Sequence, residues 1–360
     1  MKTLITILDG ITQTSMPFNE FVLYRASHYK DEKQIVICLC GKKDLSDFNI
    51  PEGLDIRFIG RNLLTIRKTI KQVIKETEDE YTIHLHQVQS AFLSQVSMIG
   101  TGMRKKTLFT VHSTFSGYKF HNKFLSFVNA LFANRITCVS NTSYEDYPKT
   151  IKNIKKDRIC SIQNGVDTER IDRILEGITK DYNRKTTDYI YVARLLPIKN
   201  QMLLTRVLPK IDGNVRFIFV GAEDPSYDVK KRAKEEGVED RIVFTGLIPR
   251  DEVYRMLYNS DVYISSSTLE GLPISVLEAM YCGLPCILSD IPQHRETAQG
   301  VATLLGLKDE ESWVSEINKF ASASREQREQ TGMAAREYVK KNFSLQVMHE
   351  KYDSIYEKLY

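Results

Sequence analysis

The sequence lacks several features that would place it in a special class of protein. No apolar run approaches the roughly 18 residues that cross a bilayer, so we expect no membrane-spanning helix. The opening MKTLITILDG is a short apolar run that meets an acid at Asp9, so we expect no signal peptide. The 50 Lys and Arg nearly balance the 46 Asp and Glu, and a net charge of +4 does not by itself imply nucleic acid as a partner. These absences predict a cytoplasmic protein, with attachment to the inner face of the cell membrane left open.

Two further patterns are missing. The six cysteines match no zinc-binding spacing, and most of them lie in strand-like apolar runs, so we interpret them as small, reduced core residues. The G-x-G-x-x-G dinucleotide fingerprint is also absent, because only Gly10 follows the first predicted strand and Gly100–Gly102 lacks a third glycine. The second absence argues against a Rossmann-type dehydrogenase.

The 360 residues suggest two domains of ordinary size, and apolar strands alternate with helices in both halves. In the first half we expect strands at residues 2–8, 34–40, 54–59, 81–86, 108–112, 135–139 and 158–162. In the second half we expect strands at 189–192, 216–220 and 242–244, with further strands around 262–264 and 285–288. This alternation predicts two doubly wound, mostly parallel α/β sheets.

The domain boundaries follow from composition. Residues 168–188 are charged and poor in strands, so we expect an interdomain linker there, between a first domain at 1–167 and a second at 189–340. Residues 341–360 contain an amphipathic helix, which we expect to return to the first domain.

One stretch, from Asp261 to Asp290, organises the second half. It predicts a strand, a tight loop, a helix over 274–282, a turn and a second strand. Pro273 suits the first helical turn, where its missing N–H costs nothing, and Gly283 suits a left-handed helix end.

Two glutamates in this stretch are candidate binding residues. Glu270 and Glu278 are eight residues apart, so about two turns would place them on one side if the helix began at Glu270. Free N–H groups at a helix start bind anions or sugar hydroxyls, and an acid in a mostly apolar helix needs a polar partner. The alternative is that Glu270 only complements the helix dipole and Glu278 is solvated.

The surrounding residues favour the binding interpretation. The E-x7-E pattern in EGLPISVLEAMYCGLP resembles the signature of the retaining GT-B glycosyltransferases of family 4. The run from Ala193 to Lys199 also resembles that family's A-R-L-x-x-x-K segment. The resemblance covers Gln163 to Cys286 well and the first half only by pattern. It implies GT-B architecture, in which two Rossmann-like domains face a cleft.

The resemblance also implies residue roles. Arg194 and Lys199 would hold the donor diphosphate, Glu278 the ribose hydroxyls, and Glu270 with the backbone of Gly271, Leu272 and Pro273 the sugar. Among these, Pro273 has no N–H to give. Gly246, Leu247 and Ile248 would lie beside the nucleotide base. Gly10 would also contact the donor, although the family usually has two glycines in this loop and this sequence has one.

Histidines complete the expected site. His112 lies in a T-x-H context at the end of a predicted strand, where the resemblance implies that it faces the donor sugar and phosphate. His86 resembles a second family histidine. We expect His84 and His86 to point to opposite faces of their strand, which argues against a shared metal. A lone histidine is otherwise more often structural.

The resemblance implies transfer of a hexosyl unit from a UDP- or GDP-sugar to an acceptor hydroxyl, with retention and without a protein nucleophile. The chain contains no D-x-D pair, so we expect no metal and no other cofactor. Two alternatives stay open: a non-catalytic nucleotide-sugar-binding subunit, and a GT-B-like epimerase or phosphorylase.

The expected acceptor is a sugar, a glycan or a lipid-linked glycan in cell-surface polysaccharide or glycolipid synthesis. Basic residues of the first half could face an anionic membrane, or could form an ordinary solvated surface. They are Arg67, Lys68, Lys71, Lys75, Arg104, Lys105, Lys106, Lys119 and Lys123.

Overall fold

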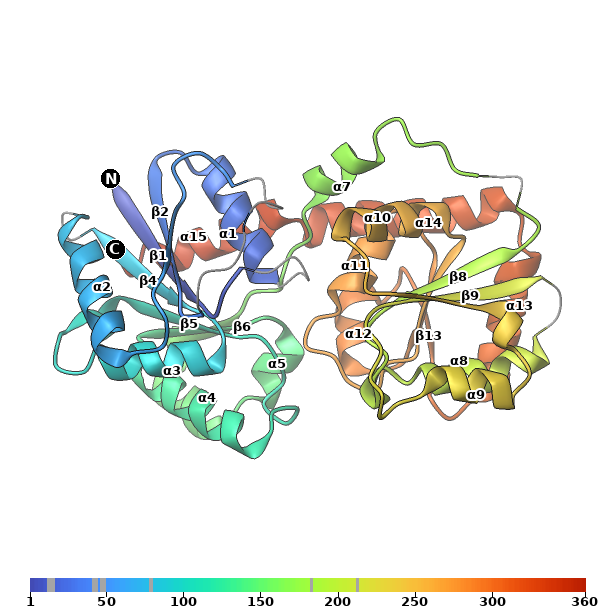
Figure 1. The fold of residues 1–360 in the computed structure, drawn as a ribbon, viewed down its shortest axis with the longest axis horizontal. Helices are drawn as coiled ribbons and strands as arrows, with labels where there is room; N and C mark the ends of the chain where they lie inside the picture. Colours follow the sequence, from blue (N-terminus) through green and yellow to red (C-terminus); the bar gives the residue numbers. More distant parts are fainter. Residues whose placement is uncertain (12–16, 41–44, 46–49, 78–79, 182–183, 212–213) are drawn as a thin grey trace. The chain divides into compact units, whose positions relative to one another are not determined.

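The computed structural model describes residues 1–11, 17–40, 45, 50–77, 80–181, 184–211 and 214–360. The chain forms two compact units, each around its own parallel sheet (Figure 1). The first unit combines Met1–Gly165 with Leu345–Tyr360, and the second is Val166–Ser344. Among the described helices, none is both long and apolar enough to cross a bilayer.

The first unit has a seven-stranded parallel sheet in the order β3-β2-β1-β4-β5-β6-β7. Its strands are β1 (Lys2–Leu8), β2 (Glu32–Cys38), β3 (Asp55–Phe58), β4 (Tyr81–Leu85), β5 (Thr107–Val111), β6 (Arg135–Cys138) and β7 (Ile159–Ser161). Its helices are α1 (Pro17–His28), α2 (Leu63–Lys75), α3 (Val88–Ser97), α4 (Phe120–Phe132), α5 (Asn141–Asp146), α6 (Lys149–Lys155), α15 (Leu345–Tyr356) and the 3-10 turns η1 (Met103–Lys106) and η2 (Lys156–Arg158).

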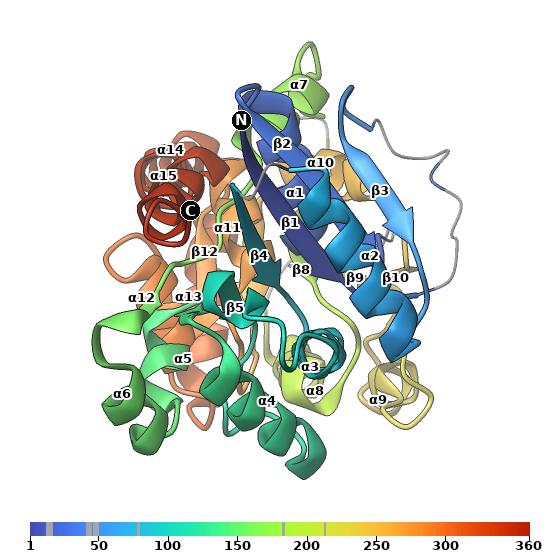
Figure 2. The same cartoon turned by 90° about the vertical axis from the view of Figure 1, so that its left-hand side faces the viewer.

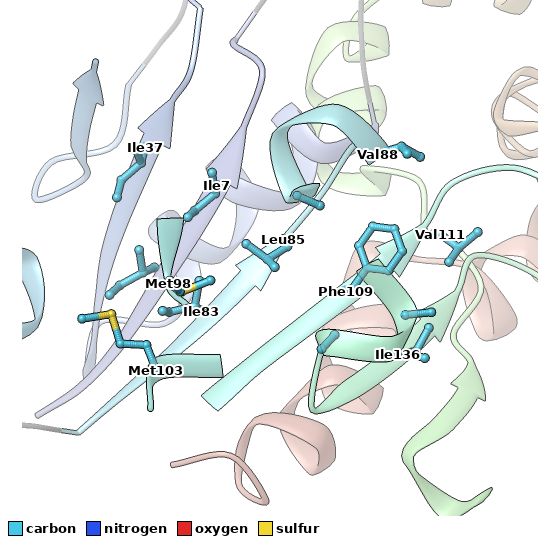
Figure 3. Close-up of a cluster of buried hydrophobic side chains, with 14 of the residues drawn as sticks. Ile7, Ile37, Ile83, Leu85, Val88, Met98, Met103, Phe109, Val111 and Ile136 are labelled. Atoms are coloured by element: carbon cyan, nitrogen blue, oxygen red, sulfur yellow. The ribbon is translucent and has the colours of Figure 1, made fainter. Parts of the chain in front are cut away.

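The central strands of this sheet are buried on both faces, so their apolar runs split by alternation into two cores. Ile7, Ile37 and Ile83 pack with residues of α2, α3 and α4 on one face (Figure 3). Leu4 and Val36 point to the other face, where they pack with residues of α1 and α15. The prediction that the last helix returns to the first domain is therefore confirmed, with the helix beginning at Leu345.

The second unit has a six-stranded parallel sheet in the order β10-β9-β8-β11-β12-β13. Its strands are β8 (Thr187–Val192), β9 (Val215–Val220), β10 (Ile242–Gly246), β11 (Val262–Ser265), β12 (Cys286–Ser289) and β13 (Thr303–Leu305). Its helices are α7 (Thr168–Leu175), α8 (Gln201–Val207), α9 (Val229–Glu235), α10 (Arg250–Asn259), α11 (Ile274–Tyr281), α12 (Pro292–Ala298), α13 (Glu310–Ser322), α14 (Arg325–Asn342) and the 3-10 turns η3 (Pro197–Lys199), η4 (Leu208–Lys210) and η5 (Glu239–Arg241).

The expected linker at 168–188 differs from the structure. Helix α7 occupies its first part, β8 begins at Thr187, and the range belongs to the second unit. Asp167 caps α7 by accepting from the N–H of Arg170, and Asp172 accepts from the hydroxyl of Tyr281. The charged composition misled the prediction, because five of the eight residues of α7 are polar or charged and only Ile171 is fully buried.

Candidate active site

The carboxyl ends of β8 and β11 bring two predicted site residues into contact. Lys199 ends the turn η3 after β8, and Glu270 lies in the loop after β11. The Lys199 ammonium lies 2.6 and 2.7 Å from the two carboxylate oxygens of Glu270. Both side chains are largely buried, with 22% and 13% exposure, so this ion pair is only partly screened by water.

Backbone and side-chain hydrogen bonds hold the two loops together around this pair. The N–H of Thr268 donates to the carbonyl of Ile198 at 2.8 Å, and the hydroxyl of Tyr191 donates to the carbonyl of Lys199 at 2.8 Å. Ser267 donates to Glu270 at 2.6 Å. The ammonium and the carboxylate are therefore positioned by a rigid frame rather than by long flexible loops.

Arg194 lies in the same loop as Lys199, directly after β8, and its side chain is exposed. Its carbonyl accepts from the Gln201 amide at 3.1 Å, which ties the loop to α8. The pKa of the Asp224 carboxyl is lowered by hydrogen bonds from Ser226, with a smaller contribution from the Arg194 charge. Arg194 and Lys199 thus place two positive charges at one edge of the second sheet.

Glu278 is fully buried on α11. Its carboxylate accepts from the Arg250 guanidinium and, at 3.1 Å, from the hydroxyl of Tyr254. The idea that Glu278 is a solvated surface residue is therefore wrong. The geometric argument linking it to Glu270 is also wrong, because α11 begins at Ile274 and Glu270 lies in the loop before it.

The loop between the two glutamates is half-buried at Gly271 and buried at Leu272 and Pro273. Pro273 is the N-cap residue of α11, one position before the predicted first helical turn, because its φ of −79° and ψ of 84° are not helical. Gly283 has a φ of +80°, so the predicted left-handed helix end is confirmed.

The turn after β10 contains the residues predicted to contact the base, and it is followed closely by Arg250, which donates to Glu278. Gly246 has a φ of +67° and accepts from the N–H of Gly221, whereas Leu247 is exposed and Ile248 half-buried. Two residues further on, Arg250 begins α10. The turn and Glu278 are therefore linked through one short segment.

Sequence reasoning missed Arg250 and Tyr254 as neighbours of Glu278. Arg250 also donates to the hydroxyl of Tyr254 at 2.9 Å. The available signal was their spacing, since residues four apart share one face of a helix. That face lies against α11, which only the tertiary structure decides.

The first unit holds Gly10 and His112, each after the carboxyl end of a strand of one sheet. Gly10 is buried, and the neighbouring Thr12, Thr14 and Ser15 lie outside the described residues. His112 Nε2 lies 2.9 Å from His86 Nδ1, and burial lowers the pKa of His112 to about 4. At neutral pH His112 is therefore neutral, and one of its ring nitrogens can donate a hydrogen bond while the other can accept one.

The expectation that His84 and His86 point to opposite faces is wrong. Their rings are 3.9 Å apart, because residues two apart in a strand share a face. His84 contacts the Tyr356 hydroxyl at 2.7 Å and the Thr110 hydroxyl at 2.6 Å. Within the described ranges, no group of three or more His, Cys, Asp or Glu could hold a metal ion.

Two family models match the chain. Residues 25–170 match the model described as Glycosyltransferase Family 4, and residues 178–338 match the model described as Glycosyl transferases group 1. The first match falls mostly on the first unit, and the second lies within the second unit.

Curated relatives carry related names. A putative glycosyltransferase EpsF of Bacillus subtilis (strain 168) is 25% identical, over 74% of this chain and 73% of its own. The phosphatidylinositol N-acetylglucosaminyltransferase GPI3 subunit of Saccharomyces cerevisiae is 28% identical, over 58% of this chain and 48% of its own. An Escherichia coli UDP-Gal:alpha-D-GlcNAc-diphosphoundecaprenol alpha-1,3-galactosyltransferase is 28% identical, over 64% of this chain and 62% of its own. The matched region thus spans only about half of the length of the yeast relative.

Solved structures share the fold. Anabaena HepE, determined in complex with UDP and glucose, has a TM-score of 0.79 at 15% identity, over 99% of this chain and 100% of that chain. A glycosyltransferase from Rickettsia africae has a TM-score of 0.81 at 20% identity, over 99% of this chain and 98% of that chain. The predicted GT-B class of fold, with two Rossmann-like units, is therefore confirmed.

Proposed function

Because the chain belongs to the glycosyltransferases of group 1 and family 4, we propose that it moves a hexosyl unit from a UDP- or GDP-sugar to an acceptor hydroxyl, with retention of anomeric configuration. The contact between Lys199 and Glu270 carries this proposal. It joins the two sequence segments that resemble the family's donor site, at the strand ends where α/β sheets bind ligands.

The donor's diphosphate would lie against Lys199 and Arg194. A diphosphate is a stronger partner for an ammonium than one carboxylate, and the exposed Arg194 guanidinium can form a two-point contact with phosphate oxygens. Binding would then loosen the hold of Lys199 on Glu270. The freed carboxylate could accept from sugar hydroxyls, next to the N–H groups of Gly271 and Leu272.

The nucleoside would lie between Glu278 and the turn of Gly246, Leu247 and Ile248. Glu278 already accepts from Arg250 and Tyr254, so its carboxylate is oriented before any ligand arrives. A carboxylate has about four lone-pair sites, which leaves acceptor capacity for ribose hydroxyls.

The chemistry would need no protein nucleophile. The departing phosphate oxygen would take the acceptor proton while the cations of Lys199 and Arg194 stabilise the negative charge that develops on the diphosphate. The roles of His112 and Gly10 in donor binding stay predictions from the family resemblance. We propose that no metal and no other cofactor takes part, since the two cations can neutralise the leaving group.

The acceptor would be a sugar, a glycan or a lipid-linked glycan in polysaccharide or glycolipid synthesis. The yeast and E. coli relatives are named for transfer to phosphatidylinositol and to a diphosphoundecaprenol-linked sugar, which supports a lipid-linked acceptor here. An enzyme with such an acceptor would work at the cytoplasmic face of a membrane, with no role for nucleic acid.

A donor panel tests the proposal. The protein is incubated with UDP- and GDP-sugars, and release of nucleoside diphosphate is measured with and without a glycan or lipid-linked acceptor. We expect release from one donor class, stimulated by acceptor and reduced in Lys199→Ala. Tight donor binding without release would favour a binding subunit, and release that depends on inorganic phosphate would favour a phosphorylase. Conversion of the sugar to its epimer, without an acceptor, would favour an epimerase.

A further inference from the structure

Helix α4 carries an apolar stripe on its outer face. Phe120 and Phe124 are 86% and 59% exposed, and Leu131 is 38% exposed. These residues follow one another at spacings of four and seven, so they share one side of the helix. The opposite side of α4 is buried through Leu125 and Ala130.

The stripe is unusual for its composition. Among the described residues, the exposed phenylalanines are Phe120, Phe124 and Phe132, and all three lie on α4. Figures 1 and 2 show α4 at the periphery of the first unit, beside α3. Exposed apolar patches of this kind indicate an interaction site, because water disfavours them without a partner.

The stretch of sequence that contains the stripe carries charge of one sign. The sequence from Tyr81 to Tyr144 contains no aspartate or glutamate. The same range contains the basic residues Arg104, Lys105, Lys106, Lys119, Lys123 and Arg135. Lys119 and Lys123 flank Phe120 along the chain, and the Arg104 guanidinium lies 4.7 Å from the centre of the Phe132 ring.

We infer that α4 docks on an anionic lipid bilayer, with Phe120 and Phe124 inserted among the acyl chains and Lys119 and Lys123 on the phosphates. Aromatic rings on one side of a helix with cations beside them match the chemistry of a bilayer interface. The inference extends the proposed lipid-linked acceptor, since docking would hold the first unit at the surface where such an acceptor lies.

A second copy of the chain fits this surface less well. A two-fold dimer through α4 would bring the basic residues of both copies into the same interface. With no acid between Tyr81 and Tyr144, nothing in that range could neutralise them. In an anionic bilayer the headgroups complement the charge and the acyl chains complement the apolar stripe, so lipid is the occupant that the residues favour.

Vesicle flotation tests this inference without any donor or turnover. The full chain is mixed with phosphatidylcholine vesicles that contain or lack phosphatidylglycerol, at low and high salt. We expect salt-sensitive flotation with the anionic vesicles. The double variant Phe120→Ser/Phe124→Ser should bind about 100-fold more weakly, about tenfold for each inserted ring. Lys119→Ser/Lys123→Ser should bind about 25-fold more weakly, about fivefold for each lysine.

Matched controls separate α4 from general charge or apolarity. Leu64→Ser removes a side chain that is 78% exposed on α2, and Lys230→Ser/Lys231→Ser removes two cations from α9 of the second unit. Both controls should float like the parent, and thermal melts should show that every variant is folded.

Absence of flotation by the parent would overturn the inference, as would equal flotation of the phenylalanine variant. A parent dimer that the phenylalanine variant abolishes, without flotation, would assign the surface to a second copy instead. Failure of donor turnover would bear on the proposed function and not on this result.

Discussion

The substitution Glu278→Gln separates a structural role of this carboxylate from a ligand-binding one. Glu278 is 0% exposed, and its partner Arg250 has a side chain that is 14% exposed. Glutamine keeps the length, one carbonyl oxygen and a similar helix propensity, but it removes the negative charge. The substitution therefore replaces the carboxylate that pairs with the Arg250 guanidinium by a neutral amide, whose oxygen can still accept one hydrogen bond.

The expected loss of stability follows from that geometry. Leaving one partner of a buried ion pair uncompensated costs about 3–5 kcal/mol. The cost should be lower here, about 1.5–3 kcal/mol, because glutamine still accepts one hydrogen bond and Arg250 retains some access to water. For a unit of this size, that loss corresponds to a fall in Tm of about 3–12 °C.

The ligand-binding role predicts a second and separate effect. If Glu278 also accepts from ribose hydroxyls, the affinity for UDP or GDP should fall tenfold or more, because glutamine presents a donor where a hydroxyl donates. Calorimetric titration with UDP and GDP measures this, at a temperature well below the melting transition of the variant. Thermal melts of the same protein measure the structural effect.

Two controls make the test decisive. Glu310→Gln removes a carboxylate of the same unit that pairs with Arg206 and Lys210 at the surface, and we expect it to cost less than about 1 kcal/mol. Tyr254→Phe removes the hydroxyl that donates to Glu278 and accepts from Arg250, without changing a charge. A Glu278→Gln protein that melts lower but binds UDP as tightly as the parent would refute the ribose role. A protein that melts like the parent would refute the reasoning from the buried pair.

Three further predictions concern the charges and histidines. Lys199→Ala and Arg194→Ala should each lower kcat/KM for the donor about 10- to 150-fold, since each removes a charge-assisted hydrogen bond of about 1.5–3 kcal/mol; unchanged kinetics in both would remove the diphosphate role. Donor turnover should survive EDTA, and a loss that Mn²⁺ restores would contradict the absence of a metal. Burial lowers the pKa of His112 in the folded protein to about 4, from an ordinary value of 6.5. Between these two pH values the unfolded chain binds a proton at His112 and the folded protein does not. The free energy of unfolding should therefore fall as the pH drops from 6.5 to about 4. Urea unfolding over that range should therefore show a shallower pH dependence in His112→Asn than in the parent, and an equal dependence would contradict this assignment.

Local sequence determined the elements that build the donor-side unit. The run Val262–Ser265 forms a strand because it is rich in β-branched and aromatic residues. The following helix stops just before Gly283, because glycine readily adopts the positive φ of a helix end. The order of strands and helices then restricts the chain to parallel sheets, which is why the class of fold could be predicted. The carboxyl-terminal helix was also visible, because its apolar residues recur at helical spacing, whereas that spacing does not say which domain the helix packs against.

Contacts between distant segments needed the tertiary structure. Lys199 and Glu270 are 71 residues apart, and their contact depends on β8 and β11 being neighbours in the sheet. The burial of Glu278 depends in the same way on Arg250, 28 residues earlier, on a helix whose packing no local pattern reveals. Helix α7 was mistaken for a linker because it is short and most of its residues are polar or charged, although Asp167 caps it and Arg170 pairs with Asp251 of α10. The sequence therefore determines which side chains are available for binding and catalysis. The packing of strands and helices determines which partner each charged side chain contacts.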